Sequence, residues 1–203
     1  MPATPGAAPP QTPPPMKKLF LVAGARPNFM KIAPIARALD GHRAHFDYRI
    51  VHTGQHYDRE MSEVFFEELE IPAPHHHLGA GTGTHAQQTA RIMLAFEELC
   101  LRERPDLVMV VGDVNSTLAC SIVAKKLHIE VAHVEAGLRS GDMTMPEEVN
   151  RIVTDSITDH FFVTEQSGVD NLLREGKPKE RIQFVGHVMI DNLFHQVRQA
   201  MVS

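Results

Sequence analysis

Short apolar runs alternate along the chain with longer segments in which apolar and polar residues recur at helical spacing. Continuous apolar character is typical of strands that are covered on both faces of a sheet. The runs that predict such strands are 19–23, 48–53, 107–112, 130–136, 160–164 and 182–186, with a further short one near 75–78. The segments that predict amphipathic helices are 28–40, 57–69, 84–103, 116–128, 147–158, 166–176 and 188–202. This repeated order of strand and helix predicts an α/β protein with a doubly wound parallel sheet.

Three local signals set the expected ends of helices. Thr84-x-x-Gln87 and Thr144-x-x-Glu147 have the spacing of a capping box, in which two side chains bind the exposed amides at a helix start. Gly176 is expected to end the helix before it, because glycine adopts the left-handed conformation of a helix end without strain. Ligands of doubly wound sheets bind outside the carboxyl ends of the strands, so the residues that follow each strand are the candidates for function.

The first strand leads into the segment GARPNFMKIAPI, in which Pro27 suits the first turn of a helix. Arg26 and Lys31 flank this helix start, whose free amides and dipole favour an anion such as a diphosphate. The segment matches neither the P-loop nor the GxGxxG dinucleotide fingerprint. An ordinary turn with a solvated arginine and lysine explains the same residues equally well, so both interpretations stay open.

Acidic residues follow two of the later strands. Asp113 can cap the next helix, bind a sugar hydroxyl or orient a catalytic group. Glu135 lies at the end of an apolar run, where packing alone does not explain an acid. Glu135, Asp142 and Glu147 fall with Arg139 within thirteen positions, which exceeds what a capping box requires. Paired carboxylates in a partly dry pocket can divide into a proton acceptor and a proton donor, so Glu135 and Glu147 are candidates for acid–base catalysis.

Other polar groups and the two cysteines carry weaker signals. Gln55 and His56 follow the second strand and can face a ligand, although a polar loop there is more often structural. The run 75–77 consists of three histidines, but consecutive residues on a strand point to opposite faces and do not converge on one ion. No metal site is therefore predicted. Cys100 and Cys120 lie on apolar helix faces and are expected to be packing residues.

Composition narrows the class of protein. The 203 residues are 43% hydrophobic and 22% charged, as in globular proteins. A net charge of −5 disfavours a nucleic-acid binder, and no apolar run approaches the roughly 18–20 residues that cross a bilayer. Two cysteines are too few for a disulfide scaffold, so we expect a cytoplasmic protein. Residues 1–15 hold seven of the 14 prolines and no charge, which predicts a disordered arm before a single domain over 16–203.

Six segments carry a resemblance to a known family. GARPNFMKIAPI, TGQHYD, GDVNSTLA, HVEAGLRSGD, MPEEVNRIVTD and FVGHVMID occur in this order between about Lys18 and the end of the chain. Together they resemble the non-hydrolysing UDP-N-acetylglucosamine 2-epimerases, and HVEAGLRSGD followed by PEE-x-NR is the most specific part. The resemblance implies the N-terminal Rossmann-like lobe of a glycosyltransferase-B-type fold. The motifs of the C-terminal UDP-binding lobe are not found in the sequence.

The resemblance also implies a reaction. The whole enzyme would interconvert UDP-N-acetylglucosamine and UDP-N-acetylmannosamine by eliminating UDP, giving 2-acetamidoglucal, and adding UDP back. The proton on C2 is lost in the first step and returned on the opposite face in the second. Neither a cofactor nor a metal is implied.

The matched positions take roles from the family. The substrate-binding candidates are Arg26 and Lys31, which match positions that hold the nucleotide, together with Arg139. The catalytic candidates are Asp113, Glu135 and Glu147, which match acidic active-site positions. The candidates for an allosteric substrate site, as in some bacterial members, are Gln55 and His56.

Several functions stay open. As half of an enzyme, the chain would bind UDP-sugars weakly and turn them over negligibly by itself. The longer protein would be a homodimer. The alternatives are a stand-alone nucleotide-sugar-binding module without catalysis, a hydrolysing 2-epimerase that releases free N-acetylmannosamine, and a glycosyltransferase on the same scaffold.

Overall fold

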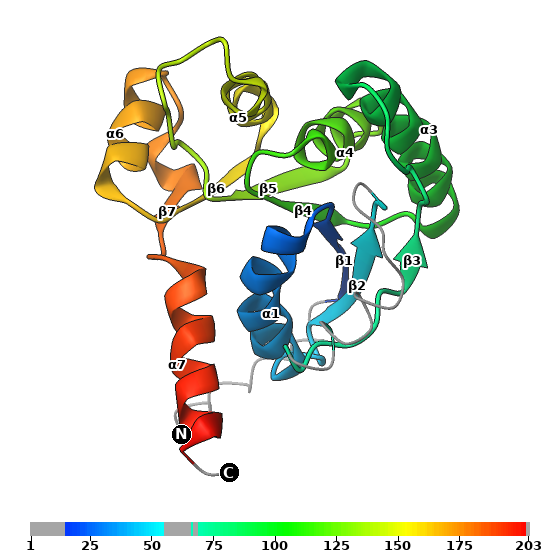
Figure 1. Ribbon diagram of the computed structural model, residues 1–203, viewed down its shortest axis with the longest axis vertical. Helices are drawn as coiled ribbons and strands as arrows, with labels where there is room; N and C mark the ends of the chain where they lie inside the picture. Colours follow the sequence, from blue (N-terminus) through cyan, green and yellow to red (C-terminus); the bar gives the residue numbers. More distant parts are fainter. Residues whose placement is uncertain (1–14, 55–65, 67–68, 202–203) are drawn as a thin grey trace, which may run out of the picture.

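The described residues of the computed structural model, 15–54, 66 and 69–201, form one parallel sheet with helices on both faces. The seven strands lie in the order β3-β2-β1-β4-β5-β6-β7 (Figure 1). They are β1 (Lys17–Ala23), β2 (Phe46–His52), β3 (His76–His77), β4 (Leu107–Val111), β5 (Glu130–Val134), β6 (His160–Val163) and β7 (Ile182–Phe184). The helices are α1 (Arg26–Asp40), α3 (His85–Glu103), α4 (Asn115–Lys126), α5 (Pro146–Ile157), α6 (Gln166–Arg174), the 3₁₀ turn η1 (Lys179–Arg181) and α7 (Val188–Ala200).

The direction in which strands are added to the sheet reverses at β1. Leu21 of β1 lies opposite Ile50 of β2 on one side and Met109 of β4 on the other. The first part of the chain therefore extends the sheet towards β3, and the later part extends it towards β7. This arrangement confirms the predicted doubly wound α/β fold, and its switch point lies between β1 and β4.

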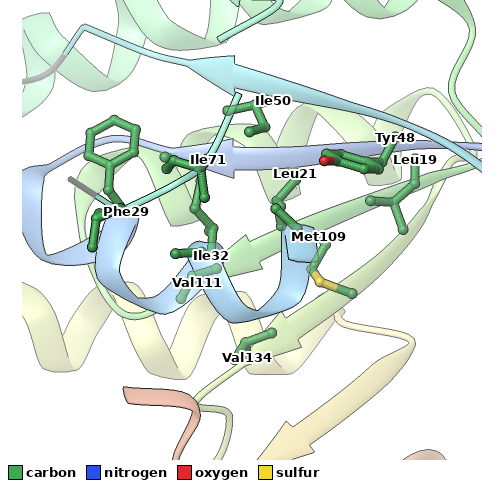
Figure 2. Close-up of a cluster of buried hydrophobic side chains, with 14 of the residues drawn as sticks. Leu19, Leu21, Phe29, Ile32, Tyr48, Ile50, Ile71, Met109, Val111 and Val134 are labelled. Atoms are coloured by element: carbon green, nitrogen blue, oxygen red, sulfur yellow. The ribbon is translucent and has the colours of Figure 1, made fainter. Parts of the chain in front are cut away.

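Both faces of the central strands are buried. Figure 1 shows α1 and α7 on one face of the sheet and α3, α4 and α5 on the other. Leu19 and Leu21 of β1 pack on the α1 side, in the cluster that Figure 2 shows, while Phe20 and Val22 pack on the α3 and α4 side. Each fully buried side chain of this size contributes about 1.5–3 kcal/mol to folding. Burial on both faces explains why the strands were continuous apolar runs.

Most strands end one or two residues earlier than predicted, and β4 and β5 show the reason. The runs 107–112 and 130–136 were expected to be strand throughout, but β4 ends at Val111 and β5 at Val134. The next residues, Gly112 and Glu135, both have φ of +70°, which lies outside the extended region. Each strand therefore ends in a left-handed turn.

Of the two predicted capping boxes, one is confirmed and one is wrong. The N–H of Gln87 donates to Thr84 Oγ1 at 3.3 Å, and the N–H of Thr84 donates to Gln87 Oε1 at 3.2 Å, at the start of α3. At α5, however, the Thr144 hydroxyl donates to Asp142 at 2.7 Å. The helix starts one residue later than a cap at Thr144 requires, with Met145 as the N-cap and no side-chain hydrogen bond.

Gly176 ends α6 as predicted. It has φ of +79°, its N–H donates to the carbonyl of Leu173, and the N–H of Lys177 donates to the carbonyl of Leu172. This pair of hydrogen bonds is the Schellman arrangement.

Some expectations concern residues outside the described part of the chain. The predicted arm, apart from Pro15, and nearly all of the predicted helix 57–69 lie there. Within the described part, no helix is long and apolar enough to cross a membrane.

Candidate active site

The turn between β1 and α1 is tied to the end of β4 by one buried side chain. Asn28 Oδ1 accepts hydrogen bonds from the N–H groups of Gly24, at 3.3 Å, and Ala25, at 2.9 Å. Asn28 Nδ2 donates to the carbonyl of Val111 at 3.1 Å. This residue therefore fixes the turn across the switch point of the sheet. The sequence reasoning did not single out Asn28, because its partner on β4 is distant in sequence.

Lys31 of α1 and Glu135 after β5 form an ion pair at the switch point. Lys31 Nζ lies 2.5 Å from Glu135 Oε2, and the two side chains are 15% and 7% exposed. The left-handed turn at Glu135 is held by its own N–H, which donates to the carbonyl of Phe162 at 3.0 Å. The left-handed conformation is about 1–2 kcal/mol less favourable for a residue other than glycine, so contacts with the surrounding structure must hold Glu135 in it. Two residues predicted from separate motifs thus meet.

Gly112 leaves room for this pair. A Cβ atom built on Gly112 would lie 3.3 Å from Lys31 Nζ, 3.4 Å from Asn28 Nδ2 and 3.6 Å from Glu135 Oε2. Its φ of +70° also favours glycine. Gly112 therefore lies where the polar ends of three side chains converge, directly before Asp113 in the chain.

Asp113 is held by two consecutive residues of α5. The guanidinium of Arg151 forms an ion pair with the Asp113 carboxylate, and Asn150 Nδ2 donates to the Asp113 carbonyl at 2.8 Å. Asp113 does not cap α4, which begins without a side-chain cap. Arg151 was missed as a functional candidate, although it lies within the PEE-x-NR motif. Its spacing of four residues from Glu147, which places both on one side of α5, was an available signal.

Glu147 and Glu148 differ sharply in their surroundings. Glu148 is 2% exposed and accepts hydrogen bonds from the N–H groups of Ser140, at 2.9 Å, and Gly141, at 3.0 Å. Burial by itself raises the pKa of Glu148, but these two hydrogen bonds bring its pKa below the ordinary value. Glu147 is half-buried, and its carboxylate makes no hydrogen bond or ion pair with any described residue. Glu148 therefore closes the loop before α5, while Glu147 is available to a ligand.

Arg139 is engaged within the protein. Its Nε and Nη2 bind the two carboxylate oxygens of Glu175 at 2.9 and 2.8 Å. Its Nη1 lies 2.7 Å from the carbonyl of Leu138 and 2.8 Å from Asp155 Oδ2. The described contacts thus place Arg139 with Asp155 and Glu175, and none joins it to Asp113 or Glu135. Substrate binding by Arg139 stays a prediction.

Three of the candidates are not described by the structure at the level of side chains. Arg26 is the first residue of α1, but its side chain lies outside the described part, as do Gln55 and His56 entirely. Substrate binding by Arg26 and an allosteric role for Gln55 and His56 stay predictions.

The remaining groups considered from sequence are placed clearly. Cys100 and Cys120 are buried, and burial raises the pKa of the Cys100 thiol to about 12, which confirms them as packing residues. His76 and His77 form β3, and His75 Nδ1 accepts a hydrogen bond from the N–H of Ile50 at 3.0 Å. In the described ranges, no group of three His, Cys, Asp or Glu side chains is arranged to hold a metal ion.

The family of the chain follows from comparison with known proteins. A family model described as UDP-N-acetylglucosamine 2-epimerase matches residues 37–202. The chain belongs to this family. The match includes the segments that carry Asp113, Glu135 and Glu147.

Individual members of the epimerase family are similar over most of this chain. The UDP-N-acetylglucosamine 2-epimerase of Methanocaldococcus jannaschii is 45% identical over 183 residues, which are 90% of this chain and 50% of that protein. The UDP-2,3-diacetamido-2,3-dideoxy-D-glucuronate 2-epimerase of Pseudomonas aeruginosa is 44% identical over 185 residues, 90% of this chain and 52% of that protein. The chain therefore spans about half the length of the curated relatives it matches.

A solved structure shows the same lobe. The M. jannaschii UDP-GlcNAc 2-epimerase in complex with UDP-GlcNAc and UDP superposes with a TM-score of 0.87 and 44% identity. The similarity covers 92% of this chain and 51% of that one. The predicted Rossmann-like lobe of a glycosyltransferase-B-type fold is thereby confirmed.

Proposed function

We propose that the chain is the acid-bearing lobe of an enzyme that interconverts UDP-N-acetylglucosamine and UDP-N-acetylmannosamine in the cytoplasm. The observation that carries this proposal is the Lys31–Glu135 pair at the switch point. The Asp113–Arg151 pair begins at the next residue after Gly112, which lies beside the first pair. In the forward step a carboxylate removes the proton from C2, the electron pair forms the C1=C2 double bond, and the C1–O bond to UDP breaks. In the return step UDP adds to C1 and a proton is delivered to the opposite face of C2.

The environments of the acids suit this division of work. Glu135 lies against the ammonium of Lys31, while Glu147 has no partner among the described residues. Groups in such different surroundings can serve as acid and base in one reaction. In this proposal Glu135 and Glu147 lie on opposite faces of C2, where one removes the proton and the other returns it. Asp113, fixed by Arg151, orients the sugar.

In this proposal the diphosphate of UDP binds at the start of α1. Positive charge from Arg26 and Lys31, with the dipole of the helix, stabilises the charge that builds up on departing UDP. The nucleotide itself is the leaving group, so the reaction needs neither a nicotinamide nor a metal. Lys31 would then stabilise both the diphosphate and Glu135.

A second lobe completes the site in this proposal, and the longer protein is a homodimer. The chain matches about half of its relatives' length, and a cleft with one wall positions substrate poorly. We expect the 203-residue chain to bind UDP-N-acetylglucosamine weakly and to exchange the C2 proton negligibly in D₂O, followed by NMR. Exchange at an ordinary enzymatic rate would show that this lobe suffices for catalysis.

A chimaera tests the reaction itself. In it, this chain replaces the matching half of the M. jannaschii relative. We expect UDP-N-acetylmannosamine to form with one solvent deuterium at C2. Release of free N-acetylmannosamine would identify a hydrolysing epimerase instead. Tight binding by calorimetry without exchange would identify a binding module.

A second substrate is supported by a specific observation. The P. aeruginosa relative named for the 2,3-diacetamido-2,3-dideoxy-glucuronate sugar is 44% identical, against 45% for the M. jannaschii relative. Inversion at C2 is the same chemistry in both sugars. A comparison of kcat/KM for the two UDP-sugars in the chimaera distinguishes them.

A further inference from the structure

A network of ionisable side chains that starts at a buried histidine lies between the turns that carry Asp113 and Glu135. His133 of β5 and Asp155 of α5 are both 0% exposed, and His133 Nδ1 lies 2.7 Å from Asp155 Oδ1. His133 Nε2 lies 2.8 Å from the carbonyl oxygen of Gly112. The network therefore starts at the residue directly before Asp113.

The same network reaches the turn that follows Glu135. Asp155 Oδ2 accepts a hydrogen bond from the N–H of Gly137 at 2.9 Å and lies 2.8 Å from Arg139 Nη1. Arg139 in turn binds Glu175, the residue that follows α6, through both carboxylate oxygens. Two acids and two bases thus alternate along one chain of contacts.

The partners of His133 determine its protonation. The Gly112 carbonyl can only accept, so Nε2 carries a hydrogen. Asp155 Oδ2 accepts from the Gly137 N–H and lies against the Arg139 guanidinium, and this cation favours the charged carboxylate over an acid with a hydrogen on Oδ1. Asp155 is then a carboxylate, and Nδ1 must donate to it.

We propose that His133 is a positioning residue held as an imidazolium, which fixes the turns that present Asp113 and Glu135 through the Gly112 carbonyl and Asp155. The inference rests on the proposed function in taking these two acids as the reacting groups. Gly112 has φ of +70°, Glu135 +70° and Gly137 +79°, so both turns are left-handed, and Glu135, which carries a side chain, needs fixed surroundings to hold this conformation. A protonated histidine supplies two donors in one rigid ring. One binds the first turn at the Gly112 carbonyl, and the other binds Asp155 of α5, which holds the second turn through the Gly137 N–H.

The protonation is tested on the ¹⁵N-labelled 203-residue chain at pH 8, where an exposed histidine is neutral. We expect long-range ¹H–¹⁵N spectra to show both ring nitrogens of His133 with hydrogen. In D155N, the amide oxygen accepts from Gly137 and Arg139 and the amide nitrogen donates to Nδ1. We therefore expect His133 to become the neutral tautomer with hydrogen on Nε2 alone.

Asp159→Asn is the matched control for this experiment. Asp159 follows α5, accepts hydrogen bonds from Lys125 Nζ and the N–H of Val131 at 2.8 Å, and forms no hydrogen bond or ion pair with His133. We expect D159N to leave the imidazolium signals unchanged. A ring nitrogen without hydrogen in the unmodified chain, which needs no variant to fold, would overturn the proposal.

Positioning is tested by two variants that each keep one contact of His133. H133Q can place its amide nitrogen near the Gly112 carbonyl, while H133N can reach Asp155 but not Gly112. We expect H133N to shift the backbone amide signals of Gly112 and Asp113 well beyond the shifts in H133Q. Equal shifts, or unchanged signals in H133N, would overturn the positioning role.

These readouts need no turnover. A result against His133 leaves the proposed reaction standing, and an inactive chimaera leaves the His133 inference standing. The two claims can therefore fail separately.

Discussion

A methyl group at Gly112 should disturb the candidate site more than it disturbs the fold. The Cβ atom of G112A would lie 3.3 Å from Lys31 Nζ, which must move by a few tenths of an ångström, and 3.6 Å from Glu135 Oε2, which is an ordinary contact. Lys31 Nζ is the end of a flexible side chain, so the steric cost is small. The change therefore shifts the lysine of the Lys31–Glu135 pair without breaking the core.

The stability cost comes mainly from the backbone. Gly112 has φ of +70°, and a left-handed conformation costs an alanine about 1–2 kcal/mol. For a chain of this size such a loss lowers Tm by roughly 2–8 °C. Gly176 is the matched control, because it has φ of +79° and a Cβ built there meets nothing within 4 Å. G176A should cost the same free energy of unfolding without touching the site.

Urea denaturation of the two variants and C2 exchange in the chimaera separate the two effects. We expect similar losses of unfolding free energy, but a C2 exchange rate for G112A at least tenfold below that for G176A, since small misplacements near reacting groups cost up to about 100-fold. Equal exchange rates in the two variants would refute the conclusion that Gly112 makes room for the Lys31–Glu135 pair.

Three further predictions concern the surrounding turns. G137A should destabilise the chain by about 3 kcal/mol in urea denaturation, which is more than G112A. The reason is that its Cβ atom would lie 2.3 Å from the backbone oxygen of Gly168, at a φ of +79°. A loss below that of G112A would contradict the close packing. E148A should lower the free energy of unfolding by about 2–3 kcal/mol and make the 138–145 loop sensitive to limited proteolysis, because two backbone amides lose a charged acceptor. Unchanged cleavage of this loop would contradict the role of Glu148. The pKa of Asp155 is lower in the folded chain than in the unfolded chain. Its contribution to stability should therefore be full above about pH 4, the pKa of an aspartate in the unfolded chain, and should decline as the pH falls through its pKa in the folded chain. The difference in unfolding free energy between wild type and D155N should shrink over that range, and a difference that grows on acidification would reverse the assigned sign.

The sheet and the strand-end candidates were predictable because their signals are local. A strand buried on both faces must be apolar at successive residues, as Phe20 and Leu21 are, and this is visible in the sequence. The residues that follow such strands lie at one edge of a parallel sheet, which is why Asp113 and Glu135 were found. Position after a strand therefore predicted which residues the fold brings to the candidate site.

The partners were not predictable, because tertiary contacts choose them. Arg151 binds Asp113 across 38 positions, and Lys31 binds Glu135 across 104. Nothing in the local pattern of either segment records such a pairing. The capping-box spacing even drew attention to Glu147 as a cap, whereas α5 starts one residue later and Glu148 binds the preceding loop.

The measurement that tests the central claim most directly is deuterium incorporation at C2 of UDP-N-acetylglucosamine by the chimaera carrying E135Q. Glu130 at the start of β5 is the matched control, since its side chain is 58% exposed and its one ion pair among the described residues is with His160, at 3.5 Å. If Glu135 transfers the C2 proton, E135Q should lower the exchange rate by about 100- to 10,000-fold, while E130Q exchanges at the unmodified rate. Exchange by E135Q at the rate of E130Q would contradict the account.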